Sequence, residues 1–157
     1  MAFLGELPRI GENDLSDVPE IGEKNDTRLR VLLADDHPKV LENAKKLLGP
    51  DYLVVGAVSN GMMALEAARE LTPDLIVLDI EMPAMDGIRV AQEMRRIGLK
   101  SRIFFLTVHE DEDYIAAAHT FGDGYVLKSR MATDLRHAIR EALCGRFFVS
   151  RRVLETG

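Results

Sequence analysis

Four short apolar runs in this chain each end in a polar side chain, and stretches with helical periodicity separate the runs. The polar residues at their ends are the pair Asp35-Asp36, then Asp79, Thr107 and Lys128. Because apolar runs that alternate with helical stretches are typical of parallel strands, we expect the runs to be strands of one sheet. The carboxyl ends of parallel strands meet at one edge, where ligands bind. The pattern therefore predicts one site containing three acids, a hydroxyl and an ammonium.

A strand followed by a helix repeats five times between Leu29 and Gly145. The strands are expected at residues 31–34, 52–58, 75–78, 103–106 and 125–127. Pro38 stands at a helix start, and Pro73 and Gly98 stand at helix ends. Since strand-helix-strand crossovers are right-handed, five such units predict an α/β fold. The expected form is a flavodoxin-like doubly wound (βα)5 sandwich, with a parallel five-stranded sheet in the order 2-1-3-4-5.

In that order the first and third strands are neighbours, which places Asp35 and Asp36 beside Asp79. Three close carboxylates repel one another, and the repulsion raises at least one pKa unless a cation binds between them. Mg²⁺ prefers oxygen ligands and commonly binds one or two carboxylates together with a phosphate oxygen. The arrangement suits Mg²⁺-assisted phosphorylation of an aspartate.

The two ends of the chain differ from the repeating region. Residues 1–28 contain seven acids and three basic residues, which predicts a disordered acidic arm. Six apolar residues leave open a docking role for the arm: Leu4, Leu7, Ile10, Leu15, Val18 and Ile21. Residues 146–157 form a tail or the start of a linker. The apolar cluster 147–149 in this tail would be exposed unless it folds back or meets a partner.

Composition limits the cellular setting. Cys144 is the only cysteine, so no internal disulfide is possible and a reducing compartment is expected. No apolar stretch approaches the ~20 residues that span a bilayer, and no signal-peptide pattern follows Met1. We therefore expect a cytoplasmic protein without membrane contact. The net charge of −6 argues against non-specific nucleic-acid binding and favours a basic partner or a metal.

Four segments together resemble the receiver domain of two-component response regulators. They are Leu33-Ala34-Asp35-Asp36-His37-Pro38, the stretch 78–87 around Asp79, Leu106-Thr107, and Gly124-Tyr125-Val126-Leu127-Lys128. The resemblance covers roughly residues 28–145 and is to the subfamily that usually carries a C-terminal helix-turn-helix DNA-binding domain. It implies a signalling phosphoacceptor, not an enzyme, that catalyses only its own phosphorylation and dephosphorylation.

The resemblance also implies roles for the acidic residues. Asp79 would be phosphorylated by the phosphohistidine of a histidine kinase or phosphotransfer protein. Asp36, Asp79 and the backbone carbonyl of Glu81 would bind Mg²⁺ directly, and Asp35 would act on the ion through water.

Three further residues would form the remainder of the switch. Lys128 would pair with Asp79 and then with the phosphoryl oxygens. Thr107 would move to hydrogen-bond the phosphoryl group, and Tyr125 would swing inward after it. The surface expected to change comprises the helix 112–121, the strand that ends at Lys128, and the helix 132–144. This surface would regulate a partner or output domain, and a homodimer is possible.

The chain departs from the family pattern after the lysine, where Ser129 replaces a common proline. Glu81 and His109 occupy two positions that tend in this family to tune the lifetime of the phosphoryl group. The four histidines at positions 37, 109, 119 and 137 share no metal-ligand spacing, so we expect them to be surface or loop residues.

Other functions of this fold fit the same residues less well. A flavin carrier of this fold would need a phosphate-binding loop where Asp35 and Asp36 would repel a phosphate. A dehalogenase-like phosphatase would need a second acid where Pro38 stands. The remaining alternative is a non-phosphorylated pseudo-receiver that acts as a protein interaction module. No residues remain for a recognition helix, so we expect no DNA contact by this chain, whether it is a stand-alone receiver or a fragment.

Overall fold

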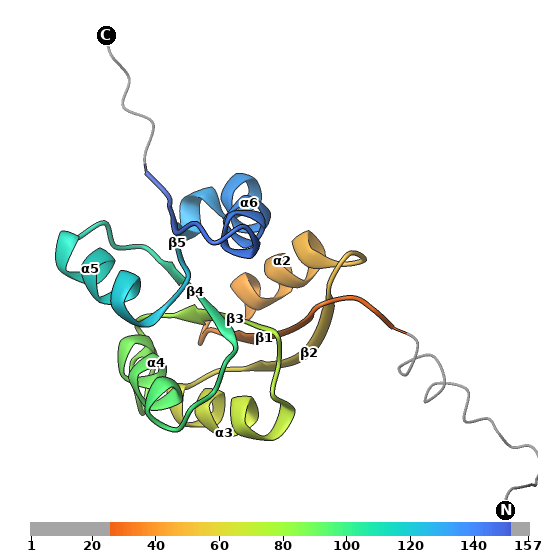
Figure 1. Cartoon of the computed structure of the whole chain (residues 1–157), viewed down its shortest axis with the longest axis horizontal. Coiled ribbons are helices and arrows are strands. Elements are labelled where there is room, and N and C mark those ends of the chain that lie inside the picture. Colours follow the sequence, from red (N-terminus) through yellow and green to blue (C-terminus); the bar gives the residue numbers. More distant parts are fainter. Residues whose placement is uncertain (1–25, 152–157) are drawn as a thin grey trace, which may run out of the picture.

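Six parallel strands form the centre of the computed structural model, in the order β2-β1-β3-β4-β5-β6. Figure 1 labels the strands β1 to β5. The structure describes residues 26–151. The strands are β1 (Arg30–Ala34), β2 (Leu53–Val58), β3 (Leu75–Asp79), β4 (Arg102–Thr107), β5 (Gly124–Leu127) and β6 (Phe148–Val149). The order of the first five strands confirms the predicted flavodoxin-like sheet. The N-terminal arm up to residue 25, and the last six residues of the tail, lie outside the described residues.

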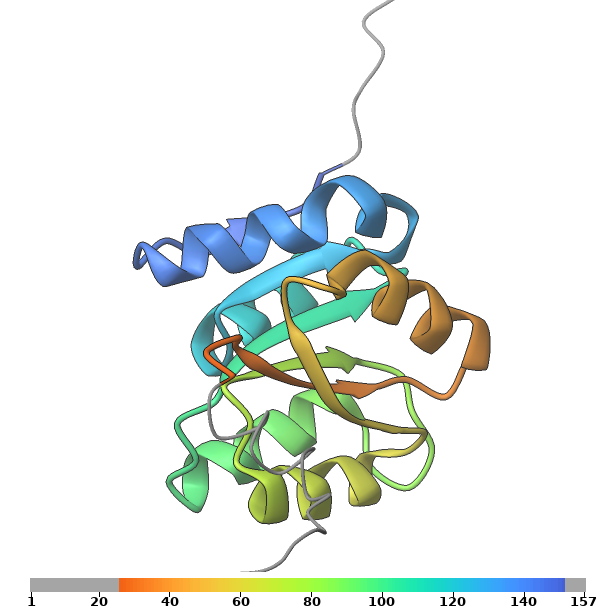
Figure 2. The same cartoon turned by 90° about the vertical axis from the view of Figure 1, so that its right-hand side faces the viewer.

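Helices cover both faces of this sheet (Figure 2). They are α2 (Pro38–Leu48), α3 (Gly61–Leu71), α4 (Gly87–Arg96), α5 (Glu112–Phe121) and α6 (Met131–Leu143), with a short 3-10 helix η2 (Lys128–Arg130) before α6. Alternate residues of each strand point to opposite faces, so the apolar strands supply two cores. Val31 and Leu33 pack with α2 and α6. Leu32 and Ala34 face the core that contains α3, α4 and α5.

The sixth strand was not predicted. Phe148 pairs with Gly124, and Val149 pairs with Tyr125, along the free edge of β5. The apolar cluster in the tail therefore folds back onto the domain: Phe147 and Val149 pack on one core and Phe148 on the other. A strand of two residues is too short to produce a recognisable alternation of apolar and polar residues.

Two helices near the predicted site begin at a capping side chain, and one of them also begins in close contact with the backbone of β3. Asn60 accepts a hydrogen bond from the Met63 amide at the start of α3, and Asp86 accepts one from the Arg89 amide at the start of α4. A Cβ atom at Gly87 would lie 2.1 Å from the carbonyl oxygen of Asp79. Glycine is therefore required for α4 to begin directly against the end of β3. Among the helices of residues 26–151, none is long and apolar enough to cross a membrane.

Candidate functional site

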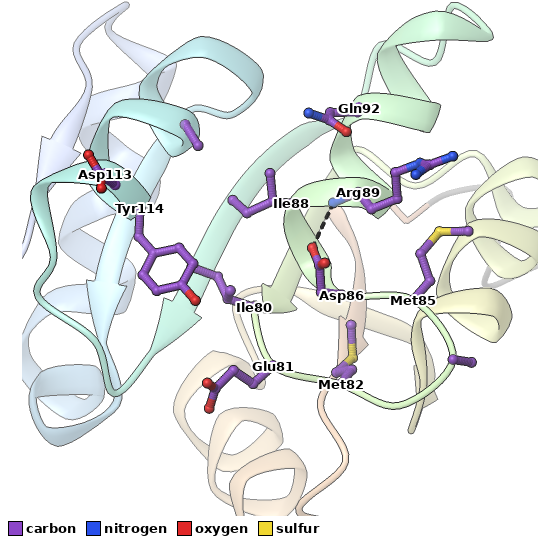
Figure 3. A pocket seen from close by; sticks show the side chains of 12 residues that line it. Ile80, Glu81, Met82, Met85, Asp86, Ile88, Arg89, Gln92, Asp113 and Tyr114 are labelled. Atoms are coloured by element: carbon purple, nitrogen blue, oxygen red, sulfur yellow. Dashed lines mark hydrogen bonds between the residues drawn. The ribbon is translucent and has the colours of Figure 1, made fainter.

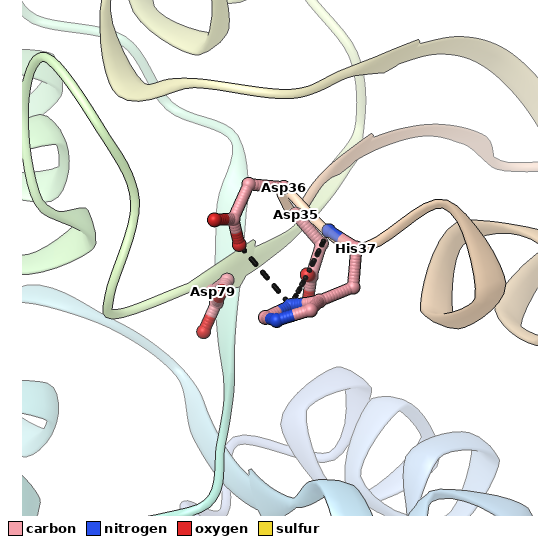
Figure 4. Close-up of side chains that lie close together, drawn as sticks. All are labelled: Asp35, Asp36, His37 and Asp79. Atoms are coloured by element: carbon pink, nitrogen blue, oxygen red, sulfur yellow. Dashed lines mark hydrogen bonds and ion pairs between the residues drawn. The ribbon is translucent and has the colours of Figure 1, made fainter.

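Three acids meet at the carboxyl ends of β1 and β3 (Figure 4). Asp35 and Asp36 follow β1 directly, while Asp79 is the last residue of β3. Because Ala34 pairs with Leu78, the two strand ends lie side by side. Asp35 is 2% exposed and Asp79 is 3% exposed. Two of the three carboxylates are thus buried, and Asp36 is half-buried beside them. The strand order led us to expect the three acids to be neighbours.

Lys128 brings the compensating positive charge. It follows β5, and its Nζ atom lies 3.0 Å from Oδ2 of Asp35 and 3.3 Å from Oδ2 of Asp79. The ammonium therefore bridges the two most buried carboxylates. This arrangement brings together residues from three different strand ends, which are 44 to 93 positions apart in the chain.

His37 joins the cluster, although the sequence predicted only a surface residue. Its imidazole is 61% exposed, and its Nδ1 atom lies 2.9 Å from Oδ1 of Asp35 and 3.1 Å from Oδ1 of Asp36. Its backbone amide also donates to Oδ1 of Asp35. The surface position is confirmed, but the contact with both acids was missed. The available signal was the position of His37, next to Asp36 in the turn from strand to helix.

Burial and charge change the acidity of Asp79. Loss of solvent around its carboxyl group and repulsion from Asp35 raise the pKa of Asp79 to about 6, against an opposing effect of Lys128. The amide of Glu81 donates a long hydrogen bond of 3.4 Å to Oδ1 of Asp79. The single nearby ammonium thus does not fully offset the combined effect of burial and carboxylate repulsion on the pKa of Asp79.

The donor set fits a hard divalent cation. The buried oxygens Asp35 Oδ2, Asp36 Oδ1 and Asp79 Oδ2 have no hydrogen-bond partner within residues 26–151, and their polar contacts there are only ion pairs. One ligand atom from each of Asp35, Asp36, His37 and Asp79 lies within 4.8 Å of the others. Clustered carboxylate oxygens that lack hydrogen bonds are the ligands that Mg²⁺ prefers.

Thr107 and Tyr125 both contact the backbone of His109 rather than the acids. Thr107 ends β4 and is buried, and its Oγ1 atom accepts a hydrogen bond of 3.0 Å from the His109 amide. Tyr125 is fully buried, and its hydroxyl donates a hydrogen bond of 2.8 Å to the His109 carbonyl. Burial raises the pKa of Tyr125 to about 12. One loop residue therefore links the hydroxyl groups of both expected switch residues.

The His109 side chain reaches a second loop. Its Nε2 atom lies 2.7 Å from Oε2 of Glu81, and its ring packs against Tyr114 with 4.9 Å between the ring centres. The sequence pointed to positions 81 and 109 but did not predict that they touch. Their contact joins the loop after β3 to the loop after β4.

A groove of 920 Å³ opens beside this contact, between α4 and α5 (Figure 3). Met82 and Met85 from the loop after β3 line it together with Ile88 of α4 and Tyr114 of α5. Glu81 stands at the boundary between the groove and the acidic cluster, since it lines the groove and its amide contacts Asp79. The acids Asp35, Asp36 and Asp79 do not line the groove, so it is a neighbouring feature and not the acidic site.

Comparison with known proteins points to one family. The family described as "Response regulator receiver domain" matches residues 31–140. The nitrate/nitrite response regulator NarL of Escherichia coli K12 is 39% identical over 123 residues, which are 76% of this chain and 57% of NarL.

Two solved structures are similar in fold and sequence. The signal receiver domain of the putative response regulator NarL from Mycobacterium tuberculosis has a TM-score of 0.71 and 31% identity, covering 77% of this chain and all of that one. A structure of two RcsB dimers bound to two parallel DNAs has a TM-score of 0.71 and 27% identity, with 80% of this chain and 65% of that one covered. The chain spans about three fifths of the length of the curated relatives it matches.

Proposed function

This chain belongs to the response regulator receiver domain family, and from that premise we propose that it accepts one phosphoryl group on Asp79 and thereby switches a signalling surface. The observation that carries the proposal is the position of Asp79. It is a buried acid that ends the strand between β1 and β4, beside two further acids and within 3.3 Å of the Lys128 ammonium. Receiver domains are signalling modules and, in general, not enzymes.

The proposed reaction is a transfer between two nucleophiles. A carboxylate oxygen of Asp79 forms a bond to the phosphorus of a phosphohistidine on a histidine kinase or phosphotransfer protein. The phosphorus–nitrogen bond of the donor breaks, and the imidazole nitrogen keeps its electron pair. Asp79 must be ionised to attack, and a pKa of about 6 leaves it mainly ionised at neutral pH.

Lys128 contacts carboxylates before the phosphoryl transfer and the phosphoryl group after it. Before the transfer it pairs with Asp79 and Asp35. After it, the ammonium is close enough to neutralise part of the ~1.5–2 negative charges that a phosphoryl group adds. Asp35 stays paired with Lys128 and His37, and this pairing holds the ammonium at the site.

Mg²⁺ is the cofactor that we propose for the acidic cluster. Asp36, Asp79 and the carbonyl of Glu81 would hold the ion directly, and Asp35 would contact it through water. When bound, the ion supplies positive charge that offsets the carboxylates and stabilises the transferring phosphoryl group. The buried oxygens of Asp36 and Asp79 that lack a hydrogen-bond partner within residues 26–151 support this assignment.

The switch that we propose starts from the hydrogen bonds of Thr107. Its hydroxyl accepts from the His109 amide, and it would exchange this bond for one to the phosphoryl group on Asp79. Release of the His109 loop would affect the Tyr125 hydroxyl, which bonds to the same residue. Helix α5 follows this loop. Ala118 is its only buried residue, while Tyr114, Ile115 and Phe121 are partly buried against the same core, so we expect α5 to move more easily than a helix with several buried residues.

The names of the curated relatives support a proposal for the downstream role. We infer that the chain regulates a DNA-binding output domain or another partner, as in a transcriptional response regulator, with a homodimer as a possible active form. The RcsB assembly named above supports dimer formation as a possibility. The usual location of such regulators, the cytoplasm, is the location that we propose. A pseudo-receiver that binds partners without phosphorylation is the alternative.

Intact-protein mass spectrometry tests the proposal. The full chain is incubated with Mg²⁺ and a small phosphodonor, with the Asp79→Asn variant as the matched control. We expect one phosphoryl adduct on the parent and none on the variant. An adduct of equal abundance on Asp79→Asn would refute the assigned residue, and no adduct on the parent under any donor would favour the pseudo-receiver alternative.

A further inference from the structure

Two grooves adjoin at the amino-terminal ends of the strands, opposite the edge that holds the acidic cluster. Their volumes are 590 and 460 Å³, and Gly98, Leu99, Lys100 and Arg102 line both. The residues that they share belong to the connection between α4 and β4 and to the first residue of β4. The two hollows therefore form one continuous surface around this connection, which we call the basic groove.

Positive charge dominates the basic groove. Lys100 and Arg102 are exposed, and their side chains have no carboxylate partner within residues 26–151. The Arg30 guanidinium lies beside the groove, where it donates to the carbonyl oxygens of Leu71 and Thr72. The rim also carries two acids: Asp123 pairs with Arg95, whereas Asp74 accepts from the backbone amide of Arg30, which is neutral and leaves the charge of the Asp74 carboxylate in place. The groove thus presents the three cations Arg30, Lys100 and Arg102 against one carboxylate, Asp74, so its net charge is positive.

The same groove has apolar walls. Leu29 and Leu99 line one part together with Leu143, which is 45% exposed, and Phe121 lines the other part. Exposed leucine surface next to unpaired cations favours a ligand that combines acidic and apolar groups. A free small anion would use the cations and leave the leucines uncovered.

The N-terminal arm has this composition and joins the domain at this place. Residues 1–25 contain six acids and two basic residues. Between residues 14 and 23, each of three acids is followed at once by an apolar residue, and the pairs recur every three positions: Asp14-Leu15, Asp17-Val18 and Glu20-Ile21. A three-residue repeat matches the three residues per turn of a polyproline II segment, which would put the acids along one edge and the apolar side chains along the next.

The N-terminal arm is joined to the domain next to the basic groove, so it is the segment of this chain outside residues 26–151 best placed to occupy the groove. Leu29, which lines the groove, follows residue 25 by only four positions. Ten extended residues span about 30 Å at 3.1 Å each, so the segment 14–23 can follow the groove away from Leu29. The short connection also gives the arm an effective concentration that an unlinked acidic peptide lacks.

We propose that residues 14–23 dock into the basic groove of their own chain, with the acids facing Arg30, Lys100 and Arg102, and with Leu15, Val18 and Ile21 on the leucine walls. The occupied surface lies at the opposite end of the strands from Asp79. The docking therefore does not depend on the proposed phosphoryl transfer and is testable without it.

The native cysteine offers a probe beside the groove. Cys144 is exposed, follows Leu143 directly and is the only cysteine in the chain. In the full ¹⁵N-labelled chain, a nitroxide on Cys144 should broaden the amide signals of residues 14–23, and reduction of the nitroxide should restore them. The double variant K100E/R102E should abolish this broadening. The matched control K39E/K46E makes the same charge change on two exposed lysines of α2 and should leave it unchanged.

A label-free measurement and a mixing experiment complete the test. In the chain without nitroxide, D17K/E20K should shift the amide signals of Leu99 to Arg102. In the chain with nitroxide on Cys144, combining D17K/E20K with K100E/R102E should restore the broadening at least in part. Equal broadening in K100E/R102E and in the parent, or none in the parent, would overturn the proposal. Broadening that passes from a spin-labelled ¹⁴N chain to a ¹⁵N chain without label would show that a second copy, not the same chain, occupies the groove.

Discussion

The imidazole of His109 and the carboxylate of Glu81 lie 2.7 Å apart and connect the loop after β4 to the loop after β3. Each partner also contacts the site through its backbone: the Glu81 amide approaches Asp79, and the His109 amide donates to Thr107. The contact therefore joins two loops next to Asp79, and we expect the joined loops to limit the access of water to a phosphoryl group there.

We predict that this contact slows hydrolysis of the phosphorylated protein. Glu81→Ala and His109→Ala should each shorten the half-life of phospho-Asp79 several-fold, because either change removes the bridge between the loops. The double variant should be no faster than the faster single variant, since both changes break one interaction. Time-resolved intact-mass measurements give the half-lives. Asp111→Ala is the control, because it removes an acid that lies 3.9 Å from the other imidazole nitrogen of His109 and keeps the contact between His109 and Glu81. Purely additive effects would contradict a shared bridge.

A second prediction concerns stability in the absence of metal. The pKa of Asp79 is raised from 3.8 to about 6 in the folded protein, so the folded state binds its proton more tightly than the unfolded state does. The contribution of Asp79 to the free energy of unfolding therefore falls as the pH rises from about 4 to about 6, and it stays unfavourable above that. Each pKa unit corresponds to about 1.4 kcal/mol. Asp79→Asn should thus stabilise the chelator-treated protein by about 1–3 kcal/mol at neutral pH and by little near pH 4.

Asp134 provides a control of opposite sign. Burial opposes its ionisation, but hydrogen bonds from Arg130, Ser150 and Thr133 outweigh the burial and lower its pKa. Asp134→Asn should therefore destabilise the protein at neutral pH, with a smaller effect in acid. Urea unfolding at several pH values measures both variants. A destabilised Asp79→Asn at neutral pH would mean that Lys128 compensates the buried charge fully.

Much of the fold and the position of the acidic cluster could be predicted from the chain alone. The buried strands are continuous apolar runs, and the polar residue that follows each run marks its carboxyl end. The order of the strands then brings Asp35 next to Asp79 without any knowledge of side-chain contacts. These predictions depend on period and chain topology, which a single sequence records directly.

The contacts made by loop side chains could not be predicted in the same way. The resemblance to receiver domains pointed to Glu81 and His109, but the distance between their side chains depends on the backbone path of two loops. The approach of His37 to the acids depends likewise on the turn after β1. The need for glycine at position 87 is visible only once α4 is seen to begin against the Asp79 carbonyl, where a Cβ atom has no room. Strand β6 was missed because its two residues carry no period.

The two acids after β1 should differ in their effect on Mg²⁺ affinity. Both oxygens of Asp35 are engaged, Oδ1 by His37 and Oδ2 by Lys128. Within residues 26–151, the polar contact of the Asp36 carboxylate is with the exposed His37 ring alone. Asp36 is therefore freer to bind the ion directly. Asp36→Ala should weaken Mg²⁺ binding by about tenfold or more, and Asp35→Ala should weaken it less. Calorimetric titration at constant pH measures both, with Glu42→Ala on α2 as an acid-removal control. Equal losses would argue against direct binding by Asp36 alone.

The last prediction separates phosphate acceptance from the conformational response. Thr107→Ala should still be phosphorylated, because the hydroxyl is not the nucleophile. The conformation of this variant should respond poorly to phosphorylation. Without the hydroxyl, residue 107 cannot exchange its hydrogen bond with the His109 amide for one with the phosphoryl group. Moving a two-state equilibrium from 1:99 to 99:1 takes ~5.5 kcal/mol, to which charge-assisted bonds from Thr107 and Lys128 would contribute. Amide NMR shifts of residues 110–126, with and without beryllofluoride as a phosphoryl mimic, measure the response. Thr107→Ser keeps the hydroxyl and should respond like the parent. If Thr107→Ala also responds fully, Thr107 does not couple Asp79 to α5.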